Sequence, residues 1–174
     1  MSELFQNQSI ELKDLPLIDP ETFKPIENAY KLFLHLRNGL LFILIFSIVI
    51  LFQLFGNSEL LNWHFAIIYI SIFIFWILSF GLVELGFPRK KYILRQHDLV
   101  YQTGYLIQST TAIPKNRIQH VEIRQSILLR IFKLSRLVIY TAGGSSSDLS
   151  ISGIKPEEAE LLKEHISLSI SEHE

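Results

Sequence analysis

The sequence predicts an α+β membrane protein, in which two transmembrane helices precede a small antiparallel β-sheet or barrel that ends in a helix. Three observations predict this fold class. Residues 38–83 contain one formally charged side chain, Glu59. Residues 156–170 show helical spacing, with Ala159, Leu162 and Ile166 along one face. Between these regions, short β-type runs separated by polar or Gly-containing turns occupy 92–94, 99–101, 105–107, 121–123, 137–140 and 149–151.

Residues 1–37 form the segment before the membrane. Asp19, Pro20 and Glu21 are typical of a helix start, and Pro25 offers a second one. Apolar side chains then recur at helical spacing as far as residue 34. Two interpretations stay open: an amphipathic helix lying in the membrane interface, or a cytoplasmic extension of the first transmembrane helix that packs on the soluble domain.

Residues 38–83 predict a transmembrane hairpin. The uncharged runs 39–55 and 65–83 span roughly 26 and 28 Å as helices, close to the thickness of a bilayer core. The short connector carries no Lys or Arg, whereas Lys31 and Arg37 precede the hairpin and three further cations follow it. The positive-inside rule therefore predicts that both chain ends are cytoplasmic. Because no ionisable group lies at mid-depth, we expect a membrane attachment rather than a transporter.

Residues 88–174 form the predicted cytoplasmic domain, and its first half is basic. The chain has a formal net charge of −1, yet residues 88–136 hold 10 Lys and Arg against 2 Asp and Glu. Anionic lipid attracts cations that lie close to the membrane. The predicted contacts with the membrane surface are Arg89, Lys90, Lys91, Arg95, Arg130 and Lys133. We also expect Glu84 and Arg89 to pair at the membrane boundary.

Residues 125–134 interrupt the β pattern and predict a short basic helix. Ile127, Leu128 and Ile131 share one helical face in this segment, while Arg130 and Lys133 point elsewhere. Two interpretations apply. The helix is a lid that packs its apolar face on the sheet, which we favour, or it docks on the membrane.

The sequence shows few groups that are able to do chemistry. The chain has no cysteine, and its six histidines lack paired ligand spacing, so we expect no metal site and no cofactor. Gly143 and Gly144 begin a loop that lacks the lysine of a phosphate-binding loop and reads as a hairpin turn. A membrane-bound enzyme using residues 145–148 of this loop is the alternative to a non-enzymatic protein.

Several segments resemble the bacterial pleckstrin-homology (PH) domain of YdbS-like membrane proteins. The resemblance extends over roughly residues 25–170, and its most specific part has the pattern IPxxRIQxVxxxQ. In this pattern the characteristic residues are Pro114, Arg117, Ile118, Gln119, Val121 and Gln125. Weaker parts are Gly143 and Gly144 after Thr141, and the helix that holds Glu157, Glu158 and Ala159.

This resemblance implies a PH-like fold, a strongly bent antiparallel sheet closed by a C-terminal helix, at the inner face of a bacterial plasma membrane. It implies no established catalytic activity and no agreed ligand. We therefore expect a non-enzymatic protein that binds membrane lipids, a second copy of itself or a partner membrane protein with PH-like domains, but no nucleic acid. Envelope maintenance or stress resistance would suit such a protein.

Overall fold

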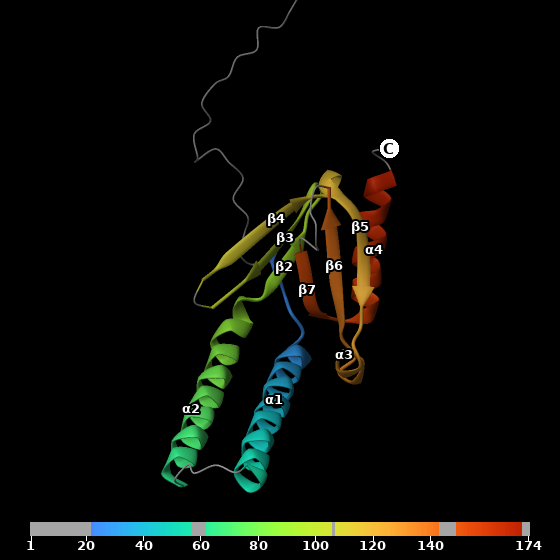
Figure 1. Cartoon of the computed structure of the whole chain (residues 1–174). Coiled ribbons are helices and arrows are strands. Elements are labelled where there is room, and N and C mark those ends of the chain that lie inside the picture. The colour runs from blue at the N-terminus through green and yellow to red at the C-terminus, as the bar shows by residue number, and fades with distance from the viewer. Residues whose placement is uncertain (1–21, 57–61, 106, 143–148, 172–174) are drawn as a thin grey trace, which may run out of the picture.

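The computed structural model describes residues 22–56, 62–105, 107–142 and 149–171. In Figure 1 two long helices extend side by side from one end of a β-rich domain, which we call the lobe. Helix α1 spans Asn28–Phe55 and helix α2 spans Asn62–Gly86, and both are long and apolar enough to cross a membrane. Most of the lobe follows the helices, from the short helix η3 (Phe87–Arg89) to helix α4 (Pro156–Ser171).

The strands of the lobe form two antiparallel sheets. The first has the order β1-β2-β3-β4 and the second the order β5-β6-β7. Figure 1 shows the second sheet beside the first, with α4 packed along β5. The bounds are β1 Lys24–Pro25, β2 Lys91–Leu94, β3 Asp98–Thr103, β4 Ser109–Pro114, β5 Ile118–Arg124, β6 Ser135–Thr141 and β7 Leu149–Ile154, with η4 (Lys115–Arg117) before β5 and α3 (Ile127–Ile131) after it.

The core lies between the sheets and the terminal helix. Leu99, Leu137, Ile139 and Ile151 are wholly buried there, one from the first sheet and three from the second. From α4, the apolar face expected from the sequence is buried as well, because Ala159, Leu162 and Ile166 face the core. A pair of apolar helices, antiparallel sheets and a C-terminal helix confirm the predicted α+β fold class.

The start of α1 belongs to the core of the lobe. The helix is continuous from Asn28 into the apolar segment, so the structure shows the second of the two interpretations, an extension packed on the lobe. Tyr30, Phe33 and Leu34 are buried in the core, and β1 pairs with β2. The helix starts later than either predicted position, after Glu27, and residues 19–21 lie outside the described residues. Residues of the segment 1–37 thus pack with the lobe.

One predicted strand is wrong. The structure has no strand at residues 105 and 107, which belong to the connection between β3 and β4, and residue 106 lies outside the described residues. Gly104, at a φ of 106°, ends β3 in a left-handed conformation that favours glycine. The next strand is β4, whose first two residues, Ser109 and Thr110, are exposed. Because its solvent-facing half is polar, β4 lacks the apolar signal from which the other strands were predicted.

Candidate membrane-surface site

Polar contacts hold α1 and α2 together at the end nearest the lobe. The carboxylate of Glu84 lies 2.5 Å from the ammonium of Lys31 and 2.9 Å from Nε2 of His35. Nearby, the amide of Asn38 donates a hydrogen bond of 2.9 Å to the hydroxyl of Ser79. These contacts come from residues far apart in the sequence, and they replace the expected pair of Glu84 with Arg89, which was wrong.

Each of the three consecutive cations after α2 lies over a different aromatic ring. Charged groups gain a modest attraction from such ring faces. The distances from cation to ring centroid are 5.4 Å for Arg89 and Tyr105, 5.7 Å for Lys90 and Tyr30, and 5.0 Å for Lys91 and Phe23. Arg89 also donates a hydrogen bond of 3.3 Å to the backbone oxygen of Tyr105. The predicted anchoring residues therefore do not converge on one point.

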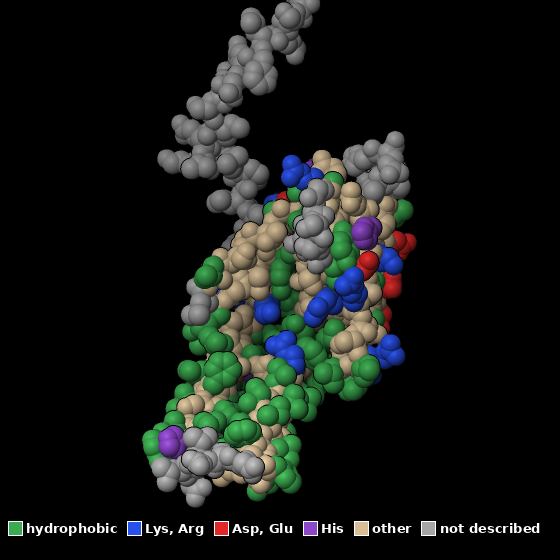
Figure 2. Space-filling model, in the orientation of Figure 1, with side chains coloured by type: hydrophobic (Ala, Val, Ile, Leu, Met, Phe, Trp, Pro, Cys, Tyr) green, Lys and Arg blue, Asp and Glu red, His purple; other side chains and the backbone are tan. Residues whose placement is uncertain are grey.

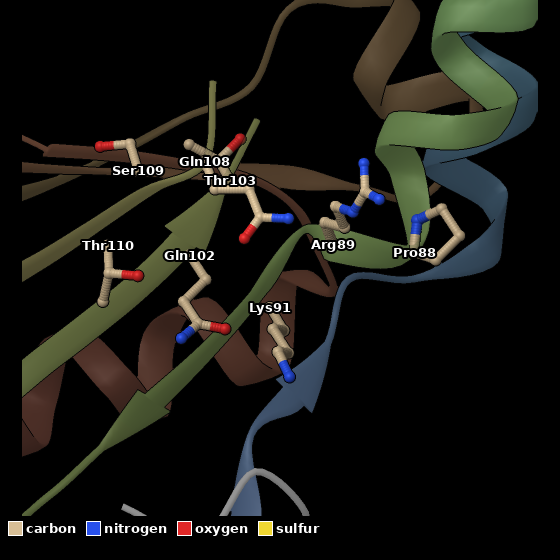
Figure 3. Close-up of a pocket in the computed structure, with 8 residues that line it drawn as sticks. All are labelled: Pro88, Arg89, Lys91, Gln102, Thr103, Gln108, Ser109 and Thr110. Carbon is tan, nitrogen blue, oxygen red and sulfur yellow. The ribbon is translucent and has the colours of Figure 1, made fainter. Parts of the chain in front are cut away.

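A shallow pocket of about 260 Å³ near the start of β2 shows this separation directly. In Figure 3 the Arg89 and Lys91 side chains point away from each other, and the rest of the lining is Pro88 and polar residues of β3, β4 and their connection, such as Gln102 and Thr110. The lining includes no carboxylate, histidine or cysteine. Amide and hydroxyl groups of this kind offer hydrogen bonds but no general acid or base.

Helix α3 ends in a turn that decides which of its side chains are buried. Lys133 has a φ of 53°, and the backbone N–H of Leu134 bonds to the oxygen of Leu129 at 2.8 Å, as in a Schellman motif. Such a motif brings these two leucines into contact, and both are buried in the lobe.

The expected apolar face of α3 is consequently wrong. Ile127 is 79% exposed and Ile131 is 69% exposed, while Leu128 is only half-buried. Sequence reasoning missed this because a helix of five residues is too short for its period to define a face. In Figure 1 α3 lies at the end of the lobe from which the two helices extend, beside the start of α1. The Phe132 ring contacts the Phe33 ring of α1, with centroids 6.0 Å apart.

Two further predicted residues, Arg130 and Lys133, lie with these isoleucines on the α3 segment. They line a pocket of about 490 Å³ together with Lys155 and with two carboxylates, Glu27 before α1 and Glu157 at the start of α4. Figure 2 shows hydrophobic and basic side chains side by side at this end of the lobe, whereas the acidic side chains lie mostly along the α4 edge. The visible face thus combines apolar and cationic groups on the side of the membrane helices.

Arg95 does not join this group. Its guanidinium bonds to the carboxylate of Asp98, with Nε 2.6 Å from Oδ1 and a second, shorter contact through Nη2. This hydrogen-bonded pair raises the pKa of Arg95. Figure 1 shows that the β2–β3 turn, which holds Arg95, is at the end of β2 that points away from the helices.

The family-motif segment forms the corner between the two sheets. Pro114 ends β4, Arg117 is exposed and accepts a backbone bond from Ala142, and Gln119 is exposed on β5. Ile118 and Val121 are buried in the core. Gln125 donates a hydrogen bond of 2.9 Å to the backbone oxygen of Leu134 and so closes the α3 segment. These contacts give the residues of the motif a structural role at the corner between the two sheets.

The corner also contains a buried lysine, and sequence reasoning did not predict its burial. Lys115 is 5% exposed, and its Nζ lies 3.1 Å from Nε2 of His165 on α4. A buried amine needs a hydrogen-bond partner, and α4 supplies it. Gly143, Gly144 and residues 145–148, the candidate loop of the enzymatic alternative, lie outside the described residues.

The fold and this surface define a class: a membrane protein whose two apolar helices carry a lobe of two antiparallel sheets and a C-terminal helix. A family model described as "Bacterial PH domain" matches residues 39–170, which is more than half of the chain. The chain therefore belongs to the bacterial PH domain family, and the resemblance seen in the sequence is confirmed.

Two curated proteins of Bacillus subtilis (strain 168) are similar to the chain. The "UPF0699 transmembrane protein YdbT" is 27% identical over 83 residues, which is 48% of this chain and 17% of that protein. The "UPF0699 transmembrane protein YdbS" is 31% identical over 77 residues, 44% of this chain and 46% of that protein. The matches thus span less than half of either relative. Both printed names describe transmembrane proteins and neither names an enzyme. No solved structure matches significantly.

Proposed function

We propose that this protein is a non-enzymatic, two-pass protein of the bacterial plasma membrane that docks its PH-like lobe on anionic lipid at the cytoplasmic leaflet. One observation carries the proposal. The α3 segment exposes Ile127 and Ile131, next to Arg130 and Lys133, at the end of the lobe from which the membrane helices extend. Apolar side chains flanked by cations are typical of surfaces that enter the headgroup region of a bilayer.

The free energies expected from these contacts are sufficient to dock the lobe on the membrane. A cation near an anionic surface contributes about 1 kcal/mol, and an isoleucine moved fully out of water contributes about 1.5–3 kcal/mol. Because α1 and α2 already hold the lobe at the membrane, docking does not carry the entropic loss of a protein arriving from solution. Ile107, which is 83% exposed in the β3–β4 connection, offers a second apolar contact.

A fluorophore on α3 tests the proposal in the full-length protein. The chain has no cysteine, so Ile131→Cys and Leu168→Cys each provide one labelling site. Residue 168 is also exposed, at 58%, but lies on α4. In nanodiscs that contain anionic lipid, an environment-sensitive dye at 131 should emit at shorter wavelength than the same dye at 168, and Ile127→Asp should reduce the difference. Equal emission at both positions would contradict docking.

The proposal requires that the lobe is cytoplasmic, as the positive-inside rule predicts. Labelling of the same two cysteines in intact cells with a membrane-impermeant reagent tests the location of the lobe. We expect protection of both positions until the membrane is opened. Labelling in intact cells would place the lobe outside.

An exposed sheet edge favours a second candidate function, binding of a protein partner or a second copy. Among the described strands β4 pairs only with β3, so its other edge is open for strand addition. Crosslinking from residue 110 in native membranes, followed by identification of the captured protein, tests this candidate.

The enzymatic alternative is tested separately. Replacing Ser145, Ser146, Ser147 and Asp148 by alanine should leave a binding protein functional, whereas an enzyme that uses this loop would lose function with its fold intact.

A further inference from the structure

The junction between the two helices and the lobe contains a cavity of about 350 Å³. Its walls come from the lobe-proximal ends of α1 and α2 and from the β3–β4 connection. The helix side includes Leu34, Leu82 and Val83, and the lobe side includes Tyr105. Two cations, Arg37 of α1 and Lys90 from the start of the lobe, also line the cavity.

The two cations line the same cavity. Burial lowers the pKa of Lys90, and the positive charge of Arg37 lowers that pKa further. Within the described residues, neither side chain has a carboxylate within 4.0 Å. The nearest polar partner of Arg37 is the side-chain oxygen of Asn38, at 3.3 Å, and Lys90 lies over the Tyr30 ring. In the part of the chain that the structure describes, no carboxylate therefore neutralises either cation, and Lys90 is the more buried of the two.

Arg37 is linked to the second helix through Asn38. The Asn38 side chain accepts a hydrogen bond from Arg37 and donates one to Ser79 of α2. Glu84 is engaged by Lys31 and His35 and does not line the cavity.

We propose that this cavity binds the phosphate of an anionic phospholipid between Arg37 and Lys90. A phosphate oxygen accepts charge-assisted hydrogen bonds from both groups, and a guanidinium matches its geometry. The ligand is a lipid because the cavity lies where the membrane helices meet the lobe, and its helix side offers apolar side chains to acyl chains. This inference rests on the proposed function for its membrane location only, since it uses neither α3 nor its isoleucines.

The test measures lipid retained by the full-length protein. The protein is purified in detergent, stripped of lipid, and titrated with phosphatidylglycerol, phosphatidylcholine or inorganic phosphate, with binding followed by native mass spectrometry. We expect one molecule of phosphatidylglycerol to bind more tightly than phosphatidylcholine, and inorganic phosphate not to displace it. Equal binding of the two lipids would overturn the anion selectivity, and displacement by inorganic phosphate would overturn the lipid assignment.

Matched variants locate the site. Arg37→Gln combined with Lys90→Gln should weaken phosphatidylglycerol binding by about tenfold or more, the loss expected when a charge-assisted bond is removed. Arg117→Gln combined with Arg136→Gln removes the same charge from exposed positions on η4 and β6 and should leave binding unchanged. Arg37→Lys keeps a cation at an exposed position and should retain most of the affinity, which controls for folding.

The outcomes distinguish this site from lobe docking. If Ile127→Asp abolishes the dye shift on α3 but phosphatidylglycerol still binds, the cavity binds the lipid headgroup independently of α3. If the dye shift persists while the Arg37 and Lys90 variant binds lipid like the unmodified protein, docking stands and the headgroup site is refuted.

Discussion

Replacing Gly153 by alanine should separate α1 from the lobe. Gly153 lies in β7 at a φ of 92°, and its backbone oxygen accepts a hydrogen bond of 3.0 Å from the N–H of Glu27, just before α1. A Cβ at this position would lie 2.4 Å from Cγ of Tyr30 and 2.6 Å from Cγ2 of Ile26. Both neighbours are buried, at 6% and 3% exposure, so neither has room to move away.

Two effects add to the destabilisation. A non-glycine residue at positive φ costs about 1–3 kcal/mol, and overpacking a filled core costs about 1–3 kcal/mol. We therefore expect the free energy of unfolding of the lobe to fall by about 3 kcal/mol or more. A domain of this size has a total of about 5–15 kcal/mol, so the change is a large fraction of its stability.

Pulse proteolysis in urea measures this loss in the full-length protein in detergent micelles. It reports the lobe, because α1 and α2 stay folded in the micelle while the lobe opens. Gly81→Ala is the matched control, since nothing lies within 4 Å of the added Cβ in α2. A urea midpoint for Gly153→Ala no lower than that for Gly81→Ala would refute the packing of α1 against β7.

Three further predictions use the same urea midpoint. His165→Leu should destabilise the lobe by about 1–3 kcal/mol because it leaves the buried Lys115 amine without its partner, while Lys115→Met should change stability less; equal losses would contradict this. Burial, aided by a bond to Glu158, raises the pKa of Tyr92 above its ordinary value of about 10, so unfolding should become easier as the pH rises above about 10, and less so in Tyr92→Phe. Lys133→Gly should leave stability unchanged or raise it by up to about 1 kcal/mol, because glycine suits the left-handed turn, yet should reduce the α3 dye shift; a large loss of stability would argue against the turn.

The charged groups of the lobe illustrate which features of its surface the sequence predicts and which it does not. Ten cations in the first half of the lobe indicate a basic surface, but they do not say which of them are free. Arg95 turns out to bond to Asp98, only three residues away, while Arg37 and Lys90 meet from two different elements. The folded structure decides which charged side chains become neighbours, and their spacing in the sequence does not predict these neighbours.

Local patterns determined most of the fold. The two apolar runs predict membrane helices from composition, since a bilayer selects length and hydropathy whatever the neighbours are. Alternation and turn residues predict the strands with an apolar face, and the motif around Pro114 and Gln125 identifies the family. Strand β4 was missed because it is polar on its exposed side, and β1 because two residues carry no period.

Tertiary structure alone decided the surface of α3 on which the proposed docking depends, and the place of the start of α1. Helix α3 has five residues, and its buried side is set by the turn at Lys133, so Ile127 and Ile131 face outward against the periodic expectation. The start of α1 joins the core because Gly153 leaves space for Tyr30. In each case a contact between distant segments outweighs a weak local preference, and only the folded chain brings those segments together.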